Sequence, residues 1–315
     1  MANEEIYARI GRADQVFVNG EGTIHGSGRA CINLLYMAYV AHQYMRKKVY
    51  VVNHSVYPEH GQVLRNTAIK NFYAGVYAAF DYVAIRETVS KSMMDSLGVR
   101  SVLSFDCLPY YIAQKFKPVQ DRSRTVVVAG SVAFQRAAAA SLAKFMGKMS
   151  EKGCELVVLT GAKQYPAADD QRFVESLAGM LEGRWRHVQA RSLEQWIETI
   201  GAASLLVSGR FHHTLAAFAL RTPFVMLASN TNKMAGLQQM LNAPKPLDYD
   251  RPDLYEALLA GASHADSKEY SDTVFNSDRL RTFTEMALRN VPSGVATAPG
   301  DQGFGGPHED PTLAE

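Results

Sequence analysis

The chain has 315 residues, of which 47% are hydrophobic and 20% are charged, and its formal net charge is +2. This length predicts two domains that each bury a core of their own. The near-neutral charge provides no basic surface of the kind that binds nucleic acid, so we expect no nucleic-acid partner.

Cysteine usage and hydropathy indicate the compartment. Cys31, Cys107 and Cys154 stand far apart and form no C-x-x-C pair, which argues against a zinc site or a disulfide framework. The longest apolar stretches are interrupted by charged or imidazole side chains, and the N-terminus lacks a basic region followed by an apolar core. We therefore expect a cytoplasmic protein that works in a reducing environment.

The first part of the chain alternates between apolar strand-like runs and helical patterns, which is typical of a parallel sheet covered by helices. Strands are expected at 15–20, 49–58, 81–87 and 101–109, and helices at 28–48, 59–75 and 90–99.

A charged stretch with a proline at 115–124 is the predicted linker, and after it the alternation starts again. Strands are expected at 125–131, 154–162, 186–192, 204–211 and 222–230, and helices at 135–153, 169–183, 193–203, 212–221, 234–241, 253–261 and 278–290. The sequence thus predicts an α/β protein of two Rossmann-like domains with a cleft between them. We assign 1–118 to the first domain, 119–290 to the second, and 291–315, rich in Gly, Pro and acidic residues, to a disordered tail.

Ligands of such domains bind at the carboxyl ends of the strands, so the turns there are the candidate sites. The segment SGRFHHTLAAFAL places Arg210 in one such turn and His212 and His213 at the start of a helix, where an anion is favoured. Neighbouring helical residues point about 100° apart, so the two histidines do not face one ligand equally. His212 is the favoured functional one, and the alternative is that one of them is a cap or core residue. Lys233, in the turn after the next strand, either neutralises a phosphate or is a solvated surface lysine.

The turn NGEGTIHG after the first strand fits neither G-x-G-x-x-G nor a Walker loop. Its glycines, Gly20 and Gly22, indicate a bend or a close approach to a ligand. Glu21 is either a general acid or base or a structural carboxylate, and His25 either lines the cleft or packs at the helix start.

Other strand ends supply further candidates. Arg86 either binds substrate or forms a structural pair with Glu87, His54 is a candidate substrate contact, and Asp106 is either catalytic or a buried turn residue. The remaining expected contacts in these turns are Asn19, Thr23, Ser131, Gly161, Ser229, Asn230 and Asn232.

Several of these segments together resemble the polysaccharide pyruvyltransferase family. The resemblance rests on VNGEGTIHG, on RETVSKSMMDSLGVRSVLSFDCLP and on SGRFHHTLAAFALRTPFVMLASNTNKMAGL, and it covers residues 14–242. It implies a GT-B-like glycosyltransferase architecture, with an acceptor side in the first domain and a donor side in the second. The departures are NGEG, where many members have a run of glycines, the second histidine and the shorter chain.

The resemblance implies transfer of a pyruvyl group from phosphoenolpyruvate to two sugar hydroxyls, with no bound cofactor and no metal. Arg210 and His212 match the family's donor-binding and catalytic residues, and Lys233 matches its downstream lysine. Glu21 is then the base or hydroxyl orienter. The acceptor would be a sugar or lipid-linked glycan, which would bring the enzyme to the periphery of the inner membrane. The alternatives are a GT-B-type glycosyltransferase that uses a nucleotide-activated sugar, and a non-catalytic sugar-binding partner.

Overall fold

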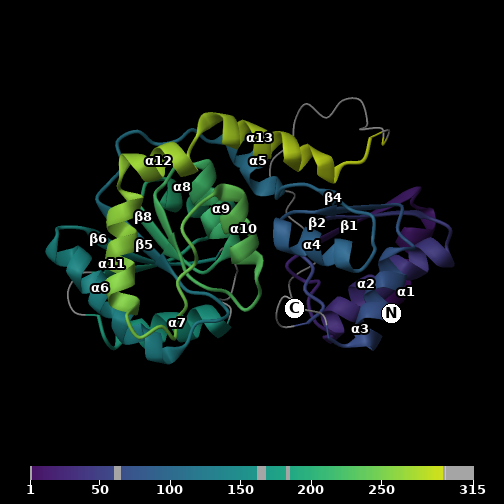
Figure 1. Cartoon of the computed structure of the whole chain (residues 1–315), viewed down its shortest axis with the longest axis horizontal. Coiled ribbons are helices and arrows are strands. Elements are labelled where there is room, and N and C mark those ends of the chain that lie inside the picture. Colours follow the sequence, from purple (N-terminus) through teal and green to yellow (C-terminus); the bar gives the residue numbers. More distant parts are fainter. Residues whose placement is uncertain (1, 60–64, 162–167, 182–184, 294, 296–315) are drawn as a thin grey trace.

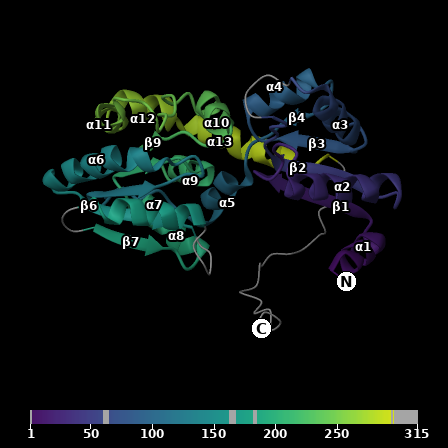
Figure 2. The same ribbon diagram turned by 90° about the horizontal axis from the view of Figure 1, so that it is seen from below.

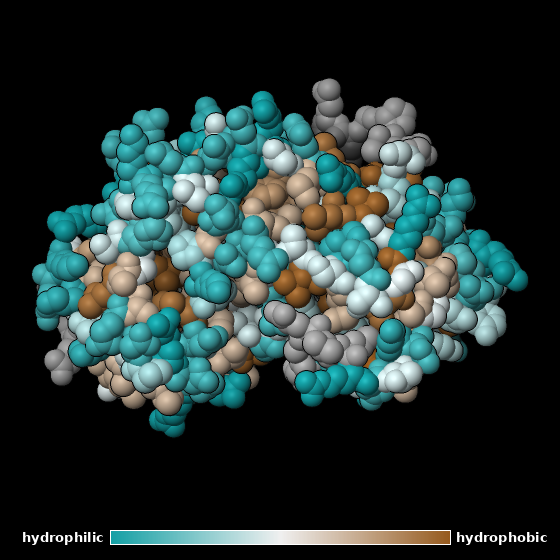
Figure 3. Space-filling view, viewed as in Figure 1, coloured by the Kyte–Doolittle hydropathy of each residue, from teal (hydrophilic) through white to brown (hydrophobic). Residues whose placement is uncertain are grey.

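The computed structural model describes residues 2–59, 65–161, 168–181, 185–293 and 295, which form two α/β lobes side by side (Figure 1). Each lobe has a parallel sheet between helices, as the sequence predicted. On the face in Figure 3, hydrophobic side chains come to the surface in patches, one of them near the junction of the lobes. No helix in the described parts of the chain is long and apolar enough to cross a bilayer.

The first lobe is built on a four-stranded parallel sheet with the order β1-β2-β3-β4. Val49 and Val51 of β2 are fully buried, because helices cover the sheet. Its elements are α1 (Ala2–Arg12), β1 (Gln15–Glu21), α2 (Arg29–Gln43), β2 (Lys48–His54), α3 (Thr67–Tyr77), β3 (Tyr82–Ile85), α4 (Thr88–Ser96) and β4 (Val102–Leu103).

The second lobe contains a five-stranded parallel sheet with the order β7-β6-β5-β8-β9. From β5 the chain first adds β6 and β7 on one side and then returns to add β8 and β9 on the other side. The point between β5 and β8 is therefore the topological switch point, where open α/β sheets bind ligands. Its elements are β5 (Thr125–Ala129), η1 (Arg136–Ala138), α6 (Ala139–Glu151), β6 (Glu155–Thr160), α7 (Ala168–Ala178), β7 (Trp185–Gln189), α8 (Leu193–Gly201), β8 (Leu205–Ser208), α9 (Phe211–Ala219), β9 (Phe224–Met226), α10 (Lys233–Leu241), α11 (Leu254–Ala265) and α12 (Lys268–Val274).

The connection between the lobes differs from the predicted strand at 101–109. Strand β4 ends at Leu103, and helix α5 (Cys107–Lys115) follows, capped by Asp106, whose Oδ1 accepts the N–H of Leu108 at 2.9 Å. Pro109 is compatible with this helix because it lies in the first turn, where no backbone N–H is needed. Residues 116–124 carry neither helix nor strand, and the proposed division at residue 118 falls within them.

Other boundaries also differ from the prediction. The helix expected at 59–75 begins only at Thr67, because Asn66 caps it by accepting the N–H groups of Ala68 and Ile69. Strand β3 stops before Glu87, because that side chain caps α4. Helices α1 and α12 were not predicted, and the tail expected to be disordered lies largely outside the described residues.

The last helix leaves the second lobe and returns to the first. Helix α13 (Ser277–Ala287) and the 3₁₀ turn η2 (Leu288–Asn290) run across the top of the molecule in Figure 1 and end beside the first sheet (Figure 2). Phe283 of α13 stacks on Phe105 with ring centroids 4.2 Å apart. Asn290 accepts the N–H of Asn53 at 2.7 Å, which ties the C-terminal part of the chain to β2.

Candidate active site

A buried arginine from the first lobe meets a histidine from the second. Arg86, directly after β3, is 1% exposed, and its Nη1 donates to Asp106 Oδ2 at 2.6 Å. His212 of α9 lies with its Nε2 3.4 Å from Arg86 Nη1 and 3.6 Å from Asp106 Oδ2. The carboxylate of Asp106 thus contacts a guanidinium and an imidazole, and it couples the two lobes at this point.

The environment of Asp106 favours its ionised form. Burial alone would raise the pKa of this carboxyl, but the hydrogen-bonded imidazole of His212 and the charge of Arg86 hold it well below its usual range. Phe211 lies under the guanidinium of Arg86, 4.3 Å from its ring centroid to Cζ, and Ser55 accepts from Arg86 Nε at 3.1 Å. Arg86 is therefore held on several sides.

Arg86 Nη2 and Lys233 Nζ face one spot above Gly22. A Cβ built on Gly22 would lie 3.8 Å from Arg86 Nη2 and 3.9 Å from Lys233 Nζ, and glycine leaves this space open. Burial, with the charges of Arg86 and Arg210, lowers the pKa of Lys233 to about 8. Cations this close repel one another, so an anion between them is stabilised by both.

Two helix N-termini open toward this part of the molecule. Helix α9 begins after Arg210 and helix α10 after Asn232, and neither N-cap side chain bonds to its helix. The first N–H groups of these helices therefore lack a side-chain cap, which favours an anionic ligand.

Arg210 lies farther from this pair, engaged with α7. Its Nη2 donates to Asp169 Oδ2 at 2.8 Å and also contacts Asp170. The charge of Arg210 nevertheless acts on Lys233, whose pKa it lowers. Two acidic residues thus hold the guanidinium.

His213 and His54 are buried within their own lobes. His213 is 8% exposed and accepts from Trp196 Nε1 at 3.1 Å, while His54 is fully buried and its Nε2 lies 2.9 Å from the hydroxyl of Tyr77. Burial lowers the pKa of each imidazole to about 3, with the charges of Arg210 and Arg86 respectively acting in the same direction. Neither histidine lies beside the Arg86–Lys233 pair. Of the two neighbouring histidines of α9, His213 is the core residue, which was one of the two alternatives that the sequence left open.

The NGEGTIHG turn stands on the first-lobe side of the site. Glu21 has a positive φ of 41° and is exposed, with Oε1 accepting from Asn19 Nδ2 at 3.2 Å. Gly20 is required because a Cβ there would lie 2.8 Å from His54 Cβ. Thr23 is exposed, and His25 is half-buried with its Nδ1 2.8 Å from the carbonyl oxygen of Gly22.

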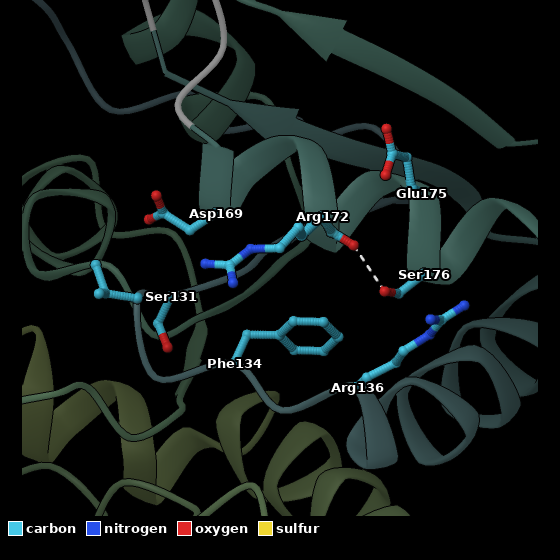
Figure 4. Close-up of a pocket in the computed structure, with 8 residues that line it drawn as sticks. Ser131, Phe134, Arg136, Asp169, Arg172, Glu175 and Ser176 are labelled. Atoms are coloured by element: carbon cyan, nitrogen blue, oxygen red, sulfur yellow. Dashed lines mark hydrogen bonds between the residues drawn. The ribbon is translucent and has the colours of Figure 1, made fainter.

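Two cavities adjoin the candidate residues. One, of about 80 Å³, lies between the lobes beside His25 and the turn 229–232, which includes Ser229, Asn230 and Asn232. The other, of about 220 Å³, lies in the second lobe and is lined by Ser131, Phe134, Asp169 and Arg172 among others (Figure 4). The structure thus brings Ser131 to the second cavity, whereas Gly161 directly follows β6 and lines neither cavity.

The sequence placed the site in the cleft between the two domains, but it left the roles of two central residues open. Asp106 was an open choice and Glu87 was considered only as a partner of Arg86. Glu87 is fully buried and accepts from the Tyr57 hydroxyl at 2.8 Å, and its carboxylate lies directly against Gly236 of α10. A buried acidic residue after a strand was the available signal, but its partner lies about 150 residues away along the chain, at Gly236.

Comparison with known proteins gives one family and one fold. A model of the family described as polysaccharide pyruvyl transferase matches residues 3–231. No curated protein sequence matches the chain.

Solved structures resemble most of the chain. UDP-GlcNAc 2-epimerase from Neisseria meningitidis, bound to UDP-GlcNAc, has a TM-score of 0.53 at 13% identity, covering 91% of this chain and 81% of its own. The Methanocaldococcus jannaschii UDP-GlcNAc 2-epimerase, in complex with UDP-GlcNAc and UDP, has 0.57 at 10%, covering 91% and 78%. Sucrose-phosphate synthase from Thermosynechococcus elongatus has 0.58 at 14%, covering 91% and 74%. At such identities the likeness concerns the fold, which is the predicted GT-B-like arrangement of two Rossmann-like domains.

Proposed function

Because this chain belongs to the polysaccharide pyruvyl transferase family, we propose that it transfers a pyruvyl group from phosphoenolpyruvate to two hydroxyls of a sugar, forming a cyclic ketal. The observation that carries this proposal is the pair of cationic donors, Arg86 Nη2 and Lys233 Nζ, above Gly22 and next to the His212–Asp106 contact. A small ligand with a phosphate and a carboxylate needs such partners.

The donor binds through charge. Lys233, Arg86 and the open N-termini of α9 and α10 hold the phosphate and the carboxylate of phosphoenolpyruvate. Arg210 joins them when the donor's anionic groups replace Asp169 and Asp170 as its partners. Buried, prearranged donors stabilise negative charge more than water does, because they need little reorganisation.

His212 acts as the general acid. It gives a proton to C3 of the donor, the C2–C3 double bond supplies the electron pair, and positive charge develops at C2. The first sugar hydroxyl attacks C2 and loses its proton. The C2–O bond to phosphate then breaks, phosphate leaves with the electron pair, and the second hydroxyl closes the ring and loses its proton. Asp106 stabilises the protonated imidazole through their contact of 3.6 Å, and Glu21 orients the hydroxyls.

This scheme uses no bound cofactor and no metal. The chemistry of the reaction also determines the acceptor that the enzyme binds. The acceptor is a sugar or a lipid-linked glycan, and with a lipid-linked acceptor the enzyme works in the cytoplasm at the periphery of the inner membrane.

Calorimetric titration with phosphoenolpyruvate tests the proposal directly. We expect the wild-type chain to bind it and Arg86→Lys to bind it about 10-fold or more weakly, because one charge-assisted hydrogen bond contributes roughly 1.5–3 kcal/mol. The control Arg251→Lys changes a half-buried surface ion pair and should bind as the wild type does. Binding of UDP or CMP with no heat from phosphoenolpyruvate would contradict the proposal.

That second result would favour a glycosyltransferase that uses a nucleotide-activated sugar. The fold is shared with proteins whose structures hold UDP-GlcNAc. The cavity of about 220 Å³ in the second lobe offers an aromatic ring, Phe134, and the guanidinium groups of Arg136 and Arg172, and these are groups that suit a base and a diphosphate. Titration with UDP and UDP-sugars in the same series distinguishes the two donors.

A further inference from the structure

The small cavity between the lobes adjoins the cation pair. Its walls are His25, Gly26, Tyr57 and Glu59 from the first lobe and residues 229–232 from the second. The carboxylate of Glu59 already accepts the backbone N–H groups of Arg65 and Asn66, each at 2.8 Å. Asn232 directly precedes Lys233, and His25 is hydrogen-bonded to the carbonyl of Gly22, so each wall of the cavity is next to one residue of the cation site. Its volume of about 80 Å³ is well below the roughly 300 Å³ at which drug-sized ligand pockets begin. A few hydroxyl groups fit there, and a nucleotide does not.

The second-lobe wall has unused hydrogen-bonding groups. Thr231 Oγ1 is buried and has no hydrogen-bond partner among the described residues. Asn232 stands at the N-cap position of α10, yet its side chain does not cap the helix. Asn230 accepts from Ser229 Oγ at a long 3.3 Å. A buried hydroxyl is normally satisfied, so Thr231 Oγ1, together with the half-buried amides of Asn230 and Asn232 beside it, indicates a ligand with hydrogen-bonding hydroxyl groups.

The first-lobe wall presents a basic nitrogen. A carbonyl oxygen only accepts, so the 2.8 Å contact with Gly22 requires the proton of neutral His25 to be on Nδ1. Nε2 then carries a lone pair, and no residue in the described parts of the chain hydrogen-bonds to it. The backbone of the glycine turn thereby fixes the tautomer of the imidazole.

We propose that this cavity binds the hydroxyl-bearing edge of the acceptor sugar and that His25 Nε2 removes the proton from the attacking hydroxyl. This inference rests on the proposed function. As the hydroxyl oxygen forms its bond to C2 of the donor, its O–H bond breaks and the proton passes to His25. Asn230, Thr231 and Asn232 hold the neighbouring hydroxyl groups. The acceptor therefore reaches C2 between the glycine turn and the turn that precedes α10.

The catalytic part is tested with His25→Gln, which keeps a polar side chain but cannot take a proton at neutral pH. The assay follows phosphate release from phosphoenolpyruvate with p-nitrophenyl glycosides of common hexoses and N-acetylhexosamines. We expect turnover to fall by about 100-fold or more, as for the loss of a general base, and the acidic limb of the pH–rate profile to disappear. The affinity for phosphoenolpyruvate, measured by calorimetry, should stay unchanged. Exposed His264 on α11 provides the control, and His264→Gln should behave as wild type.

Glu21→Gln, measured in parallel, separates the two candidate bases. If Glu21→Gln removes the acidic limb and His25→Gln does not, the assignment of His25 is overturned. If the wild-type chain fails to bind phosphoenolpyruvate, the proposed function itself fails.

The binding part needs no turnover. Saturation-transfer NMR with the same glycosides, in the presence of inorganic phosphate, compares wild type with the double variant Asn230→Ala/Asn232→Ala. We expect the glycoside signal to weaken by about 10-fold in the variant. Equal signals, or no glycoside bound by wild type, would overturn the cavity as an acceptor site.

Discussion

Among single residues, Arg86 shows how a structural and a binding role share one side chain. Nε and Nη1 are held by Ser55 and Asp106, and the ring of Phe211 lies against the guanidinium. Nη2 alone faces the open spot above Gly22. Since these contacts fix the guanidinium before a ligand arrives, little side-chain entropy is lost on binding.

Lys233 predicts how donor binding depends on pH. Its pKa is about 8 in the free chain, and an anion favours its charged form, so binding takes up a proton above this pH. The affinity for phosphoenolpyruvate should therefore be constant from about pH 7 to 8 and then fall, approaching tenfold per pH unit. Calorimetry between pH 7 and 10 measures this.

Two variants check that prediction. Lys233→Arg keeps its charge over the whole range and should flatten the profile. Lys148→Arg, on the surface of α6, should retain the wild-type profile. A Lys233→Arg profile that falls as steeply as wild type would show that another group titrates.

At the scale of elements, two helix starts without a side-chain cap lie at the site. Helices α3, α4, α5 and α8 are capped by a side chain, whereas α2, α6, α9, α10 and α11 begin without one. What distinguishes α9 and α10 is that His212 and Lys233 at their first turns lie beside Arg86. Side-chain caps are observed at Asn66, Glu87, Asp106, Ser192, Ser267 and Asn276. The N-cap residues of α9 and α10 are Arg210 and Asn232, whose side chains do not cap their helices, so the first backbone N–H groups of both helices stay available to a ligand. An arginine at a predicted N-cap is a signal that can be recognised in a sequence.

The sheets were predictable because buried parallel strands are read as apolar runs that alternate with helical patterns. The helix α5 was not, because VLSF resembles a strand and only the cap by Asp106 ends it. In the site, spacing correctly indicated that His212 and His213 face different ways, but the partner of His213, Trp196, lies on another helix. The aspartates at Arg210 likewise come from α7, and such contacts between distant segments depend on tertiary packing.

Gly236 predicts how tightly α10 must approach the first lobe. A Cβ there would lie 2.0 Å from Glu87 Oε2, and Glu87 cannot move freely because it bonds to the Tyr57 hydroxyl and to two backbone N–H groups of α4. We expect Gly236→Ala to lower the free energy of unfolding by about 1–3 kcal/mol through overpacking. Urea unfolding measures the change.

Gly147 of α6 is the matched control. A Cβ there meets no atom within 4 Å, so Gly147→Ala should raise the free energy of unfolding by about 0.5–1 kcal/mol through helix propensity. If the two alanine variants are equally stable, the close contact between α10 and Glu87 does not exist in solution.

At the scale of the whole molecule, the site depends on how the lobes are held together. Arg86 and His212 come from different lobes and lie 3.4 Å apart, so a small shift would separate them. Besides the linker, Thr88 of α4 donates to Gln239 of α10 at 2.7 Å, and the returning segment α13–η2 contacts the first sheet. These contacts restrict the lobes to the arrangement in which the site is complete.

Asn290 tests the contribution of the returning segment. It is 4% exposed, accepts the N–H of Asn53 at 2.7 Å, and donates to the carbonyl of Phe105 at 2.8 Å. Asn290→Ala leaves both backbone groups without this partner, at roughly 1–3 kcal/mol each. We therefore expect the free energy of unfolding to fall by about 2–5 kcal/mol, whereas Leu288→Ala, whose side chain is largely exposed, should stay within about 0.5 kcal/mol of wild type.

The Asn290→Ala variant also shows whether Asn290 couples the two lobes or only stabilises its own surroundings. If the returning segment holds the lobes together, Asn290→Ala should unfold over a broader urea range, with a lower m-value, because the lobes then unfold less cooperatively. Its kcat/KM should also fall, since Asn53 positions Cys107, next to Asp106, through a 3.2 Å hydrogen bond. A variant that loses stability at an unchanged m-value and unchanged kcat/KM would show that Asn290 only packs locally. The arrangement of the lobes would then depend on the α4–α10 contact, where Gly236→Ala should lower kcat/KM as well as stability.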